Sequence, residues 1–120
     1  DNHEINDKEF EMFPPHCIAG EYGSAIVDDI VVKETDKIIK KRRYSGFYGT
    51  DLDLFLREKS ISEINLVGVC TNICVLYTAA DARNIGYTVN IYKDGVATFD
   101  DEAHIFALKE AKNTLGCNII

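Results

Sequence analysis

Apolar and amphipathic runs alternate along the chain from residue 35 onward. Residues 64–69 are apolar and rich in β-branched side chains, which is typical of an interior strand of a parallel sheet. Residues 73–84 have helical composition, and Gly86 just beyond them is a common helix stop. The pattern therefore predicts a buried strand that turns directly into a helix.

Further runs predict more elements of both kinds. Alternating positions predict two more strands, at 35–41 and 87–92. Helical spacing predicts two more helices, at 51–59 and 102–115. Thr50 or Asp51 is the expected cap of the first helix. Polar, turn-rich composition predicts loops at 1–20 and 44–49. This alternation indicates βαβ units and a parallel sheet covered by helices, with ligands outside the carboxyl ends of the strands.

Composition narrows the class of protein. With 120 residues, of which 46% are apolar, the chain has room for one domain with a modest core. The net charge of −7 argues against a nucleic-acid partner, and no apolar stretch is long enough to cross a membrane. No signal peptide opens the chain.

The cysteines indicate a reducing environment. The chain has four of them, and no two form a Cys-x-x-Cys pair: Cys17, Cys70, Cys74 and Cys117. In a sequence with ordinary apolar content they are expected to be reduced thiols of a cytoplasmic protein. A disulfide framework is the less favoured alternative.

Cys74 is the strongest candidate for a nucleophile. It follows a strand end that contains Gly68, and it falls in the first turn of the predicted helix, which Thr71 or Asn72 can cap. Unpaired N–H groups and the helix dipole favour a thiolate there. The alternative is a buried structural cysteine, a common role for free thiols. Cys70 precedes the turn, and we interpret it as a contributor of backbone groups.

Lys41 is a second candidate, because it lies where the predicted strand 35–41 ends, within the basic run 40–43. An ammonium group at this place can stabilise a nearby thiolate. Spacing alone favours the other interpretation, in which the run is a solvated basic patch.

The N-terminal loop contains four side chains of the kinds that bind metals: Asp1, His3, Glu9 and His16. Carboxylate and imidazole ligands together suit zinc, iron or manganese. Histidines in polar loops are more often simply exposed to solvent, so the pattern by itself is weak.

Two aromatic residues, Phe13 and Tyr44, lie in the loops nearest these groups. Stacking on a flat ring is the functional interpretation, and ordinary packing is the alternative. Composition does not decide between the two.

Together these segments resemble a known family. Gly68-Val-Cys-Thr-Asn-Ile-Cys-Val-Leu-Tyr-Thr-Ala79 is similar to the nucleophile segment of the isochorismatase-like cysteine hydrolases. Three further segments resemble the nicotinamidase (pyrazinamidase) branch: Asp1-Asn-His3, Phe13-Pro-Pro-His16 and Lys41-Arg-Arg-Tyr-Ser-Gly-Phe-Tyr-Gly-Thr-Asp51. The resemblance extends from Asp1 to about Thr98, with the motifs in the family's order.

The resemblance implies a role for each candidate. Cys74 is the nucleophile and Lys41 is the triad lysine that supports the thiolate. A cis peptide precedes Cys70, and the N–H groups of Cys70 and Cys74 form the oxyanion hole. Phe13 and Tyr44 flank a pyridine ring. The metal ligands are Asp1, His3 and His16, with Glu9 as the fourth.

The reaction implied by the resemblance is the hydrolysis of nicotinamide to nicotinate and ammonia through a cysteine thioester, a step of NAD salvage. Pyrazinamide is expected as a second substrate. One divalent metal ion, with zinc ahead of iron or manganese, holds the pyridine nitrogen and orients water. Members of the family often self-associate, so a homo-oligomer is expected.

The chain also departs from the family's pattern. The family places a first strand with the triad aspartate, a first helix and a second strand before the metal loop, and no acidic residue here matches that aspartate. In the family's sheet order, 3-2-1-4-5-6, those strands would join residues 35–41 to residues 64–69. We therefore predict a three-layer αβα Rossmann-like parallel sheet that lacks this portion. Residues 1–120 would form one N-terminally incomplete domain with exposed apolar edges and low stability by itself.

Several explanations stay open for this departure. We favour a chain that is part of a longer protein; a proteolytic piece held by its other half and an exchanged segment that completes the sheet are alternatives. Two other functions also stay open: a related cysteine hydrolase acting on another small carboxamide or carbamoyl compound, and a non-catalytic fragment that keeps the scaffold.

Overall fold

The sheet and its helices are formed by the second half of the chain. A computed structural model describes all residues, 1–120, with these elements in chain order: α1 (Leu52–Glu58), β1 (Glu63–Val69), α2 (Leu76–Asn84), β2 (Thr88–Ala97), α3 (Asp101–Asn113) and β3 (Asn118–Ile119). Short helical turns complete the list: η1 (Lys8–Glu11), η2 (Tyr22–Ser24) and η3 (Thr71–Val75). None of the helices has the length and apolarity needed to span a membrane.

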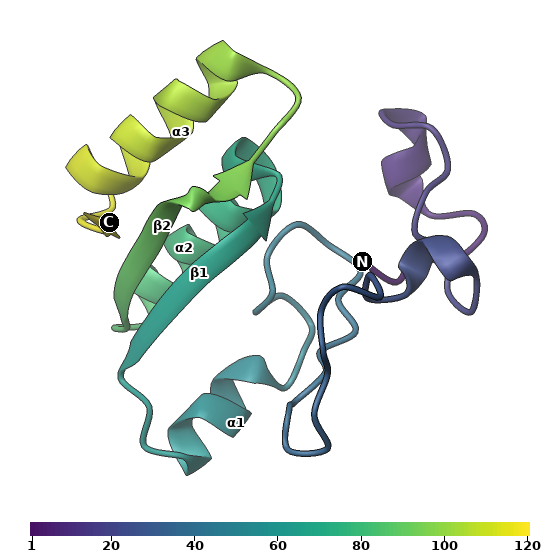
Figure 1. Cartoon of the computed structure of the whole chain (residues 1–120), viewed down its shortest axis with the longest axis horizontal. Coiled ribbons are helices and arrows are strands. Elements are labelled where there is room, and N and C mark those ends of the chain that lie inside the picture. The colour runs from purple at the N-terminus through teal and green to yellow at the C-terminus, as the bar shows by residue number, and fades with distance from the viewer.

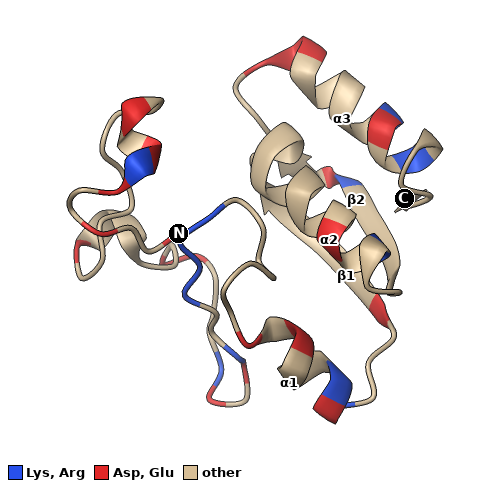
Figure 2. Cartoon of the chain, turned by 180° about the vertical axis from the view of Figure 1, so that it is seen from behind, with Lys and Arg blue, Asp and Glu red and all other residues tan.

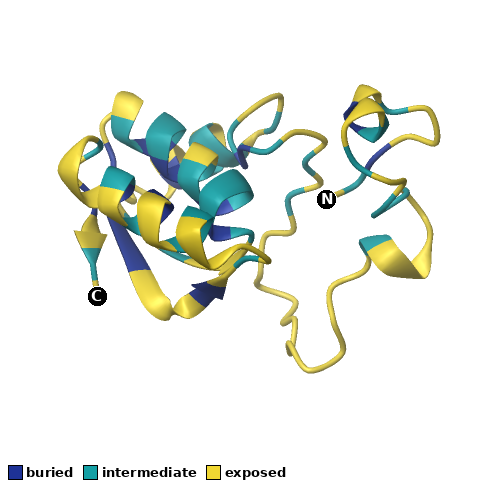
Figure 3. Ribbon diagram, turned by 90° about the horizontal axis from the view of Figure 1, so that it is seen from above, coloured by how far each residue is buried: buried dark blue, intermediate teal, exposed yellow.

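The three strands form one parallel sheet in the order β1-β2-β3. Each connection runs through a helix, α2 between β1 and β2 and α3 between β2 and β3, so both are βαβ crossovers. The two helices lie side by side on one face of the sheet (Figures 1 and 3). The parallel α/β fold expected from the alternating pattern is confirmed.

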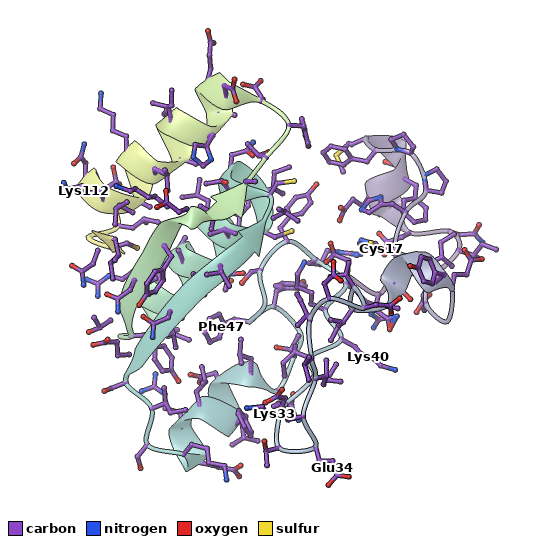
Figure 4. The ribbon with its side chains drawn as sticks, viewed as in Figure 1. Cys17, Lys33, Glu34, Lys40, Phe47 and Lys112 are labelled. Carbon is purple, nitrogen blue, oxygen red and sulfur yellow. The ribbon has the colours of Figure 1, made fainter.

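The hydrophobic core lies between these helices and the sheet. Val89 and Ile91 of β2 point towards the helices and are almost fully buried, because alternate residues of a strand share a face. Small side chains of α2, Ala79 and Ala82, are completely buried and allow the helix to approach the strands closely. Phe47 reaches the same core from the loop before α1 (Figure 4).

The other face of the sheet carries polar groups and exposed apolar side chains. The Asn90 side-chain amide donates to Asn65 Oδ1 at 3.0 Å, and the Asn118 amide donates to Asn90 Oδ1 at 2.8 Å. These two hydrogen bonds form a ladder across all three strands. Further along β1, Val67 and Val69 are 65% and 67% exposed, so β1 leaves apolar side chains uncovered.

The prediction of a strand at 35–41 is wrong. This stretch is irregular and lies beside the N-terminal loop, and its one backbone hydrogen bond to a distant segment joins the Asn2 N–H to the Lys41 carbonyl at 2.9 Å. A strand needs a partner, and no strand of the structure lies beside these residues.

Other predictions needed smaller corrections. The strand expected at 87–92 starts at Thr88 and continues to Ala97, and the pairing of β1 with β2 is irregular between Leu66 and Gly68. The short strand β3 was not predicted. The helices expected at 51–59 and 102–115 are present with slightly shorter bounds, and Asp51 precedes α1 without a side-chain cap.

The N-terminal loop is fixed by ion pairs with the basic run 40–43. Glu4 pairs with Arg42, and Asp7 pairs with Arg43 Nη1 at 3.0 Å. Figure 2 shows the basic stretch next to the acidic loop. The run predicted as either a catalytic element or a solvated patch is therefore largely paired with carboxylates.

Tyr87 offers a test of this packing, because its ring is buried against Phe47 and its hydroxyl donates to Asp53 Oδ1 at 2.8 Å. Tyr87→Phe keeps the ring and removes the hydrogen bond, so we expect a loss of about 1 kcal/mol in the free energy of unfolding. Urea unfolding measures it. Tyr92→Phe is the matched control, since Tyr92 is 40% exposed, and an equal loss in both variants would contradict the role of this bond.

Candidate active site

The candidate nucleophile lies in the turn between β1 and α2. A cis peptide joins Val69 to Cys70, as the resemblance implied, and the π-helical turn η3 follows. The Cys70 carbonyl accepts hydrogen bonds from the N–H groups of Ile73 at 3.1 Å and Val75 at 3.2 Å, which closes the turn. Cys74 therefore stands at the carboxyl end of β1, one residue before the turn passes into α2.

The expected helix cap is absent. Neither Thr71 nor Asn72 caps the turn with its side chain, and the structure has no side-chain cap at this point. The Thr71 hydroxyl is instead hydrogen-bonded to His104 Nδ1 of α3, at 2.9 Å. The cap was predicted from residue type alone, and the contact with α3 could not be seen from the local sequence.

Lys41 lies against the thiol of Cys74. Its Nζ is 3.4 Å from Cys74 Sγ, and it also forms an ion pair with the Asp1 carboxylate. The other Asp1 oxygen is 4.0 Å from the same sulfur. The Lys41 and Asp1 side chains are 19% and 17% exposed, so the contact between the ammonium and the sulfur is partly shielded from solvent.

Asp1 also belongs to a cluster of metal-binding side chains. One ligand atom each from Asp1, His3 and His16 lies within 4.8 Å of the others. His3 is completely buried, and neither of its ring nitrogens has a hydrogen-bond partner. The Glu9 carboxylate lies 3.6 Å from His16 Nε2 and 3.9 Å from His3 Nε2. A buried imidazole without a hydrogen-bond partner, beside the carboxylates of Asp1 and Glu9 and the half-exposed imidazole of His16, fits a divalent metal ion well.

Asp7 connects this cluster to the basic run. It accepts hydrogen bonds from the Glu9 N–H at 2.9 Å and from Arg43 Nη1, and it lies 3.2 Å from His3 Nδ1. These hydrogen bonds, that of the Glu9 N–H first, lower the pKa of Asp7 to about 2. Asp7 therefore stays ionised beside His3 at all ordinary pH values.

A cavity of about 320 Å³ joins the thiol to the metal-binding cluster. Phe13 and Tyr44 both line it, as do the turn residues Cys70 and Cys74. The other lining residues are Asp1, Glu9, Pro14, His16, Cys17, Val69, Ile73 and Phe99. Its volume is at the lower end of the range for small-molecule sites.

Tyr44 forms an aromatic wall of this cavity. Its ring is stacked on Tyr77 of α2, with centroids 5.7 Å apart. Burial raises the pKa of Tyr44, and the nearby Glu9 carboxylate adds to this effect. Tyr44 is therefore neutral at physiological pH, and its ring is held in place by the neighbouring helix.

Three residues at or near the cavity were missed by the sequence analysis: Phe99, Tyr77 and His104. Phe99 lies just beyond the carboxyl end of β2, where ligands are expected in such sheets. The predicted strand ended at Tyr92, so Phe99 was not recognised as a residue at a strand end. A strand extended to Ala97 would have placed Phe99 at the edge of the sheet where ligands bind. No local signal marks Tyr77 or His104, because each is defined by its contact with another segment.

Comparison with known proteins decides the family, because the isochorismatase domain matches residues 1–119. The chain belongs to the isochorismatase family. It is 40% identical to the Bacillus subtilis isochorismatase family protein PncA, over 99% of this chain and 70% of that protein. The crystal structure of B. subtilis nicotinamidase/pyrazinamidase PncA superposes with a TM-score of 0.89, at 39% identity over 97% of this chain and 67% of that one. The similarity thus lies with the nicotinamidase branch.

Other members of the family are also similar. Pyrococcus horikoshii pyrazinamidase in complex with zinc has a TM-score of 0.91 at 33% identity, over 100% of this chain and 71% of that one. Thermoplasma acidophilum N-carbamoylsarcosine amidase has the same TM-score and identity, over 99% and 67%. A probable inactive nicotinamidase of Arabidopsis thaliana is 29% identical over 92% of this chain and 62% of that protein.

The relatives are longer than this chain. It spans 70% of B. subtilis PncA, but 44% and 52% of two other B. subtilis family proteins, YwoC and YaaI. The matches therefore establish the family of residues 1–120, and they leave the activity of the whole protein as a proposal.

The contact between Lys41 and Cys74 predicts a reactive thiol. Lys41→Met removes the ammonium that stabilises the thiolate, so we expect iodoacetamide to alkylate Cys74 several-fold more slowly at neutral pH. Peptide mass spectrometry measures the rate at each cysteine separately. Lys40→Met is the control, because the adjacent Lys40 side chain extends into solvent (Figure 4). Equal alkylation rates in the two variants would show that Lys41 has no such effect.

Proposed function

We propose that this protein hydrolyses nicotinamide to nicotinate and ammonia, and accepts pyrazinamide as well. One observation carries the proposal: Lys41 Nζ lies 3.4 Å from Cys74 Sγ, and that sulfur lines a cavity whose walls include Phe13 and Tyr44. A flat aromatic ring fits between aromatic walls, and its carboxamide would then lie near the thiol.

The chemistry follows from the positions of the side chains. The Cys74 thiolate attacks the carboxamide carbon, and the Lys41 ammonium beside it is placed to give a proton to the leaving nitrogen, so that ammonia departs and a thioester remains. Water then hydrolyses the thioester to the carboxylate, and the two protons released return Lys41 to the ammonium form and Cys74 to the thiol. The N–H groups of Cys70 and Cys74 are our proposed donors to the oxyanion formed in each step.

The metal-binding cluster completes the proposed site. Asp1, His3 and His16 would hold a divalent ion, with Glu9 as the fourth ligand. We propose zinc ahead of iron or manganese, since a similar pyrazinamidase contains zinc. When bound, the ion supplies a Lewis acid at the edge of the cavity.

A second candidate function keeps the thiol chemistry and changes the substrate. The structure is as similar to N-carbamoylsarcosine amidase as to the zinc-bound pyrazinamidase, and 57% of the chain is 38% identical to the ureidoacrylate amidohydrolase RutB of Agrobacterium fabrum. A small carbamoyl compound is therefore the alternative substrate. The aromatic walls at Phe13 and Tyr44 favour nicotinamide over it.

The setting of the protein is proposed on the same basis. All four cysteines are free thiols, which suits a reducing compartment, so we propose a cytoplasmic enzyme of NAD salvage. The single domain over 1–120 and the homo-oligomer stay predictions.

The proposed nucleophile is tested with Cys74→Ala. The variant lacks the attacking sulfur, so ammonia release from nicotinamide is expected to fall to background, measured by a coupled ammonia assay. Cys117→Ala is the control, because Cys117 lies in the core away from the cavity. Turnover retained in a folded Cys74→Ala protein would rule out the covalent mechanism.

The metal site is tested with a pair of glutamates in the same helical turn. Glu9 is buried between two imidazoles, whereas Glu11 is exposed. We expect Glu9→Gln to weaken zinc binding at least about tenfold, because even the loss of a residue that only supports a metal ligand has an effect of that size. Glu11→Gln is expected to leave zinc binding unchanged. Competition with a chromophoric chelator measures the dissociation constant. Equal constants in both variants would exclude Glu9 as a ligand.

A further inference from the structure

The turn that carries Cys74 packs on the core through Val75 but makes few side-chain hydrogen bonds. No side chain caps η3, and the buried Asn72 Oδ1 has no hydrogen-bond partner. Apart from the contacts of the Cys74 thiol itself, the one side-chain hydrogen bond made by residues 71–75 is that between Thr71 Oγ1 and His104 Nδ1, at 2.9 Å.

This hydrogen bond is shielded from water. Thr71 is 1% exposed, so its hydroxyl has no solvent to replace a lost partner. The backbone of Thr71 follows Cys70 directly, and the Cys70 carbonyl closes the turn that presents Cys74. A shift of Thr71 therefore displaces the Cys70–Thr71 peptide group, whose carbonyl holds the turn closed between the two proposed oxyanion donors.

The partner helix stays in place without His104. α3 packs on the core through Ala107 and Ala111, each 1% exposed, and Asp100 caps its first turn by accepting from the Ala103 N–H at 2.9 Å. The imidazole is thus not needed to hold the helix, and its hydrogen bond connects a stable helix to the reactive turn.

We propose that His104 is a positioning residue that fixes the nucleophile turn through Thr71. His104 does not line the cavity. It acts by holding the Cys70–Cys74 backbone in the geometry that aligns the sulfur and the oxyanion donors. The proposal rests on the proposed thiol chemistry of Cys74 and adds a residue that no local motif indicates.

Two substitutions at position 104 separate positioning from simple packing. His104→Leu keeps a side chain of similar size but removes the hydrogen bond, whereas His104→Asn retains a polar atom at the position of Nδ1. We expect His104→Leu to lower kcat for ammonia release about ten- to hundredfold with KM unchanged, and His104→Asn to recover most of that loss. Ile105→Ala, at an exposed neighbour on α3, gives the baseline. Thermal unfolding confirms that each variant is folded.

Thr71 provides the other half of the test. Thr71→Val is expected to reproduce the effect of His104→Leu, and Thr71→Ser to retain activity. Combining Thr71→Val with His104→Leu should add no further loss, because both remove the same bond. Additive losses, or a folded His104→Asn protein no better than His104→Leu, would overturn the proposal.

A readout without substrate keeps this test independent of the proposed function. The alkylation rate of Cys74 by iodoacetamide is measured in the same variants, and the same order of rates is expected. If the wild-type protein releases no ammonia from nicotinamide, the proposed function fails, and the alkylation series still decides. The expected order then supports the role of His104, and equal rates in all variants overturn it.

Discussion

The packing of α2 against β2 is the interaction on which the rest of the structure depends. Completely buried alanines at positions 79 and 82 bring the helix close to Val89 and Ile91 of the sheet. Because this contact fixes the helix axis, it sets the direction in which the preceding turn enters α2, and Cys74 lies in that turn beyond the carboxyl end of β1. The chemistry of the site therefore follows from a contact between small apolar side chains some distance away.

The charges of the site form one connected unit. Asp1 pairs with Lys41 beside the thiol and also belongs to the cluster with His3 and His16. The Lys41–Cys74 contact and the imidazole cluster therefore share the Asp1 carboxylate. The pair of Asp7 with Arg43 holds the loop of the imidazoles to the loop of Lys41. The electrostatic environment of Cys74 thus depends on loops that contribute little to the hydrophobic core.

Periodicity predicted the elements whose apolar faces are buried. The strand at 64–69 was correct, and so was the helix at 73–84 apart from its start, because β1 and α2 both pack on the core; α2 begins at Leu76, after the π-helical turn. The strand at 35–41 was wrong, because alternation alone does not supply a partner strand. Residue types and a family resemblance predicted which side chains gather around the cavity. Tyr77 and His104 were not predicted, because each acts through a contact between segments that are distant in sequence.

The asparagine ladder on the open face has a consequence for how the site is assembled. Burial on the other face already disfavours a slip of one strand by a single residue, and the amides of Asn65, Asn90 and Asn118 would lose both cross-strand hydrogen bonds in such a slip. A slip would also displace the end of β2 by about 3.3 Å relative to the end of β1. The ladder therefore keeps β1 and β2 in the register at which Phe99, just beyond β2, lines the same cavity as the cysteine turn beyond β1.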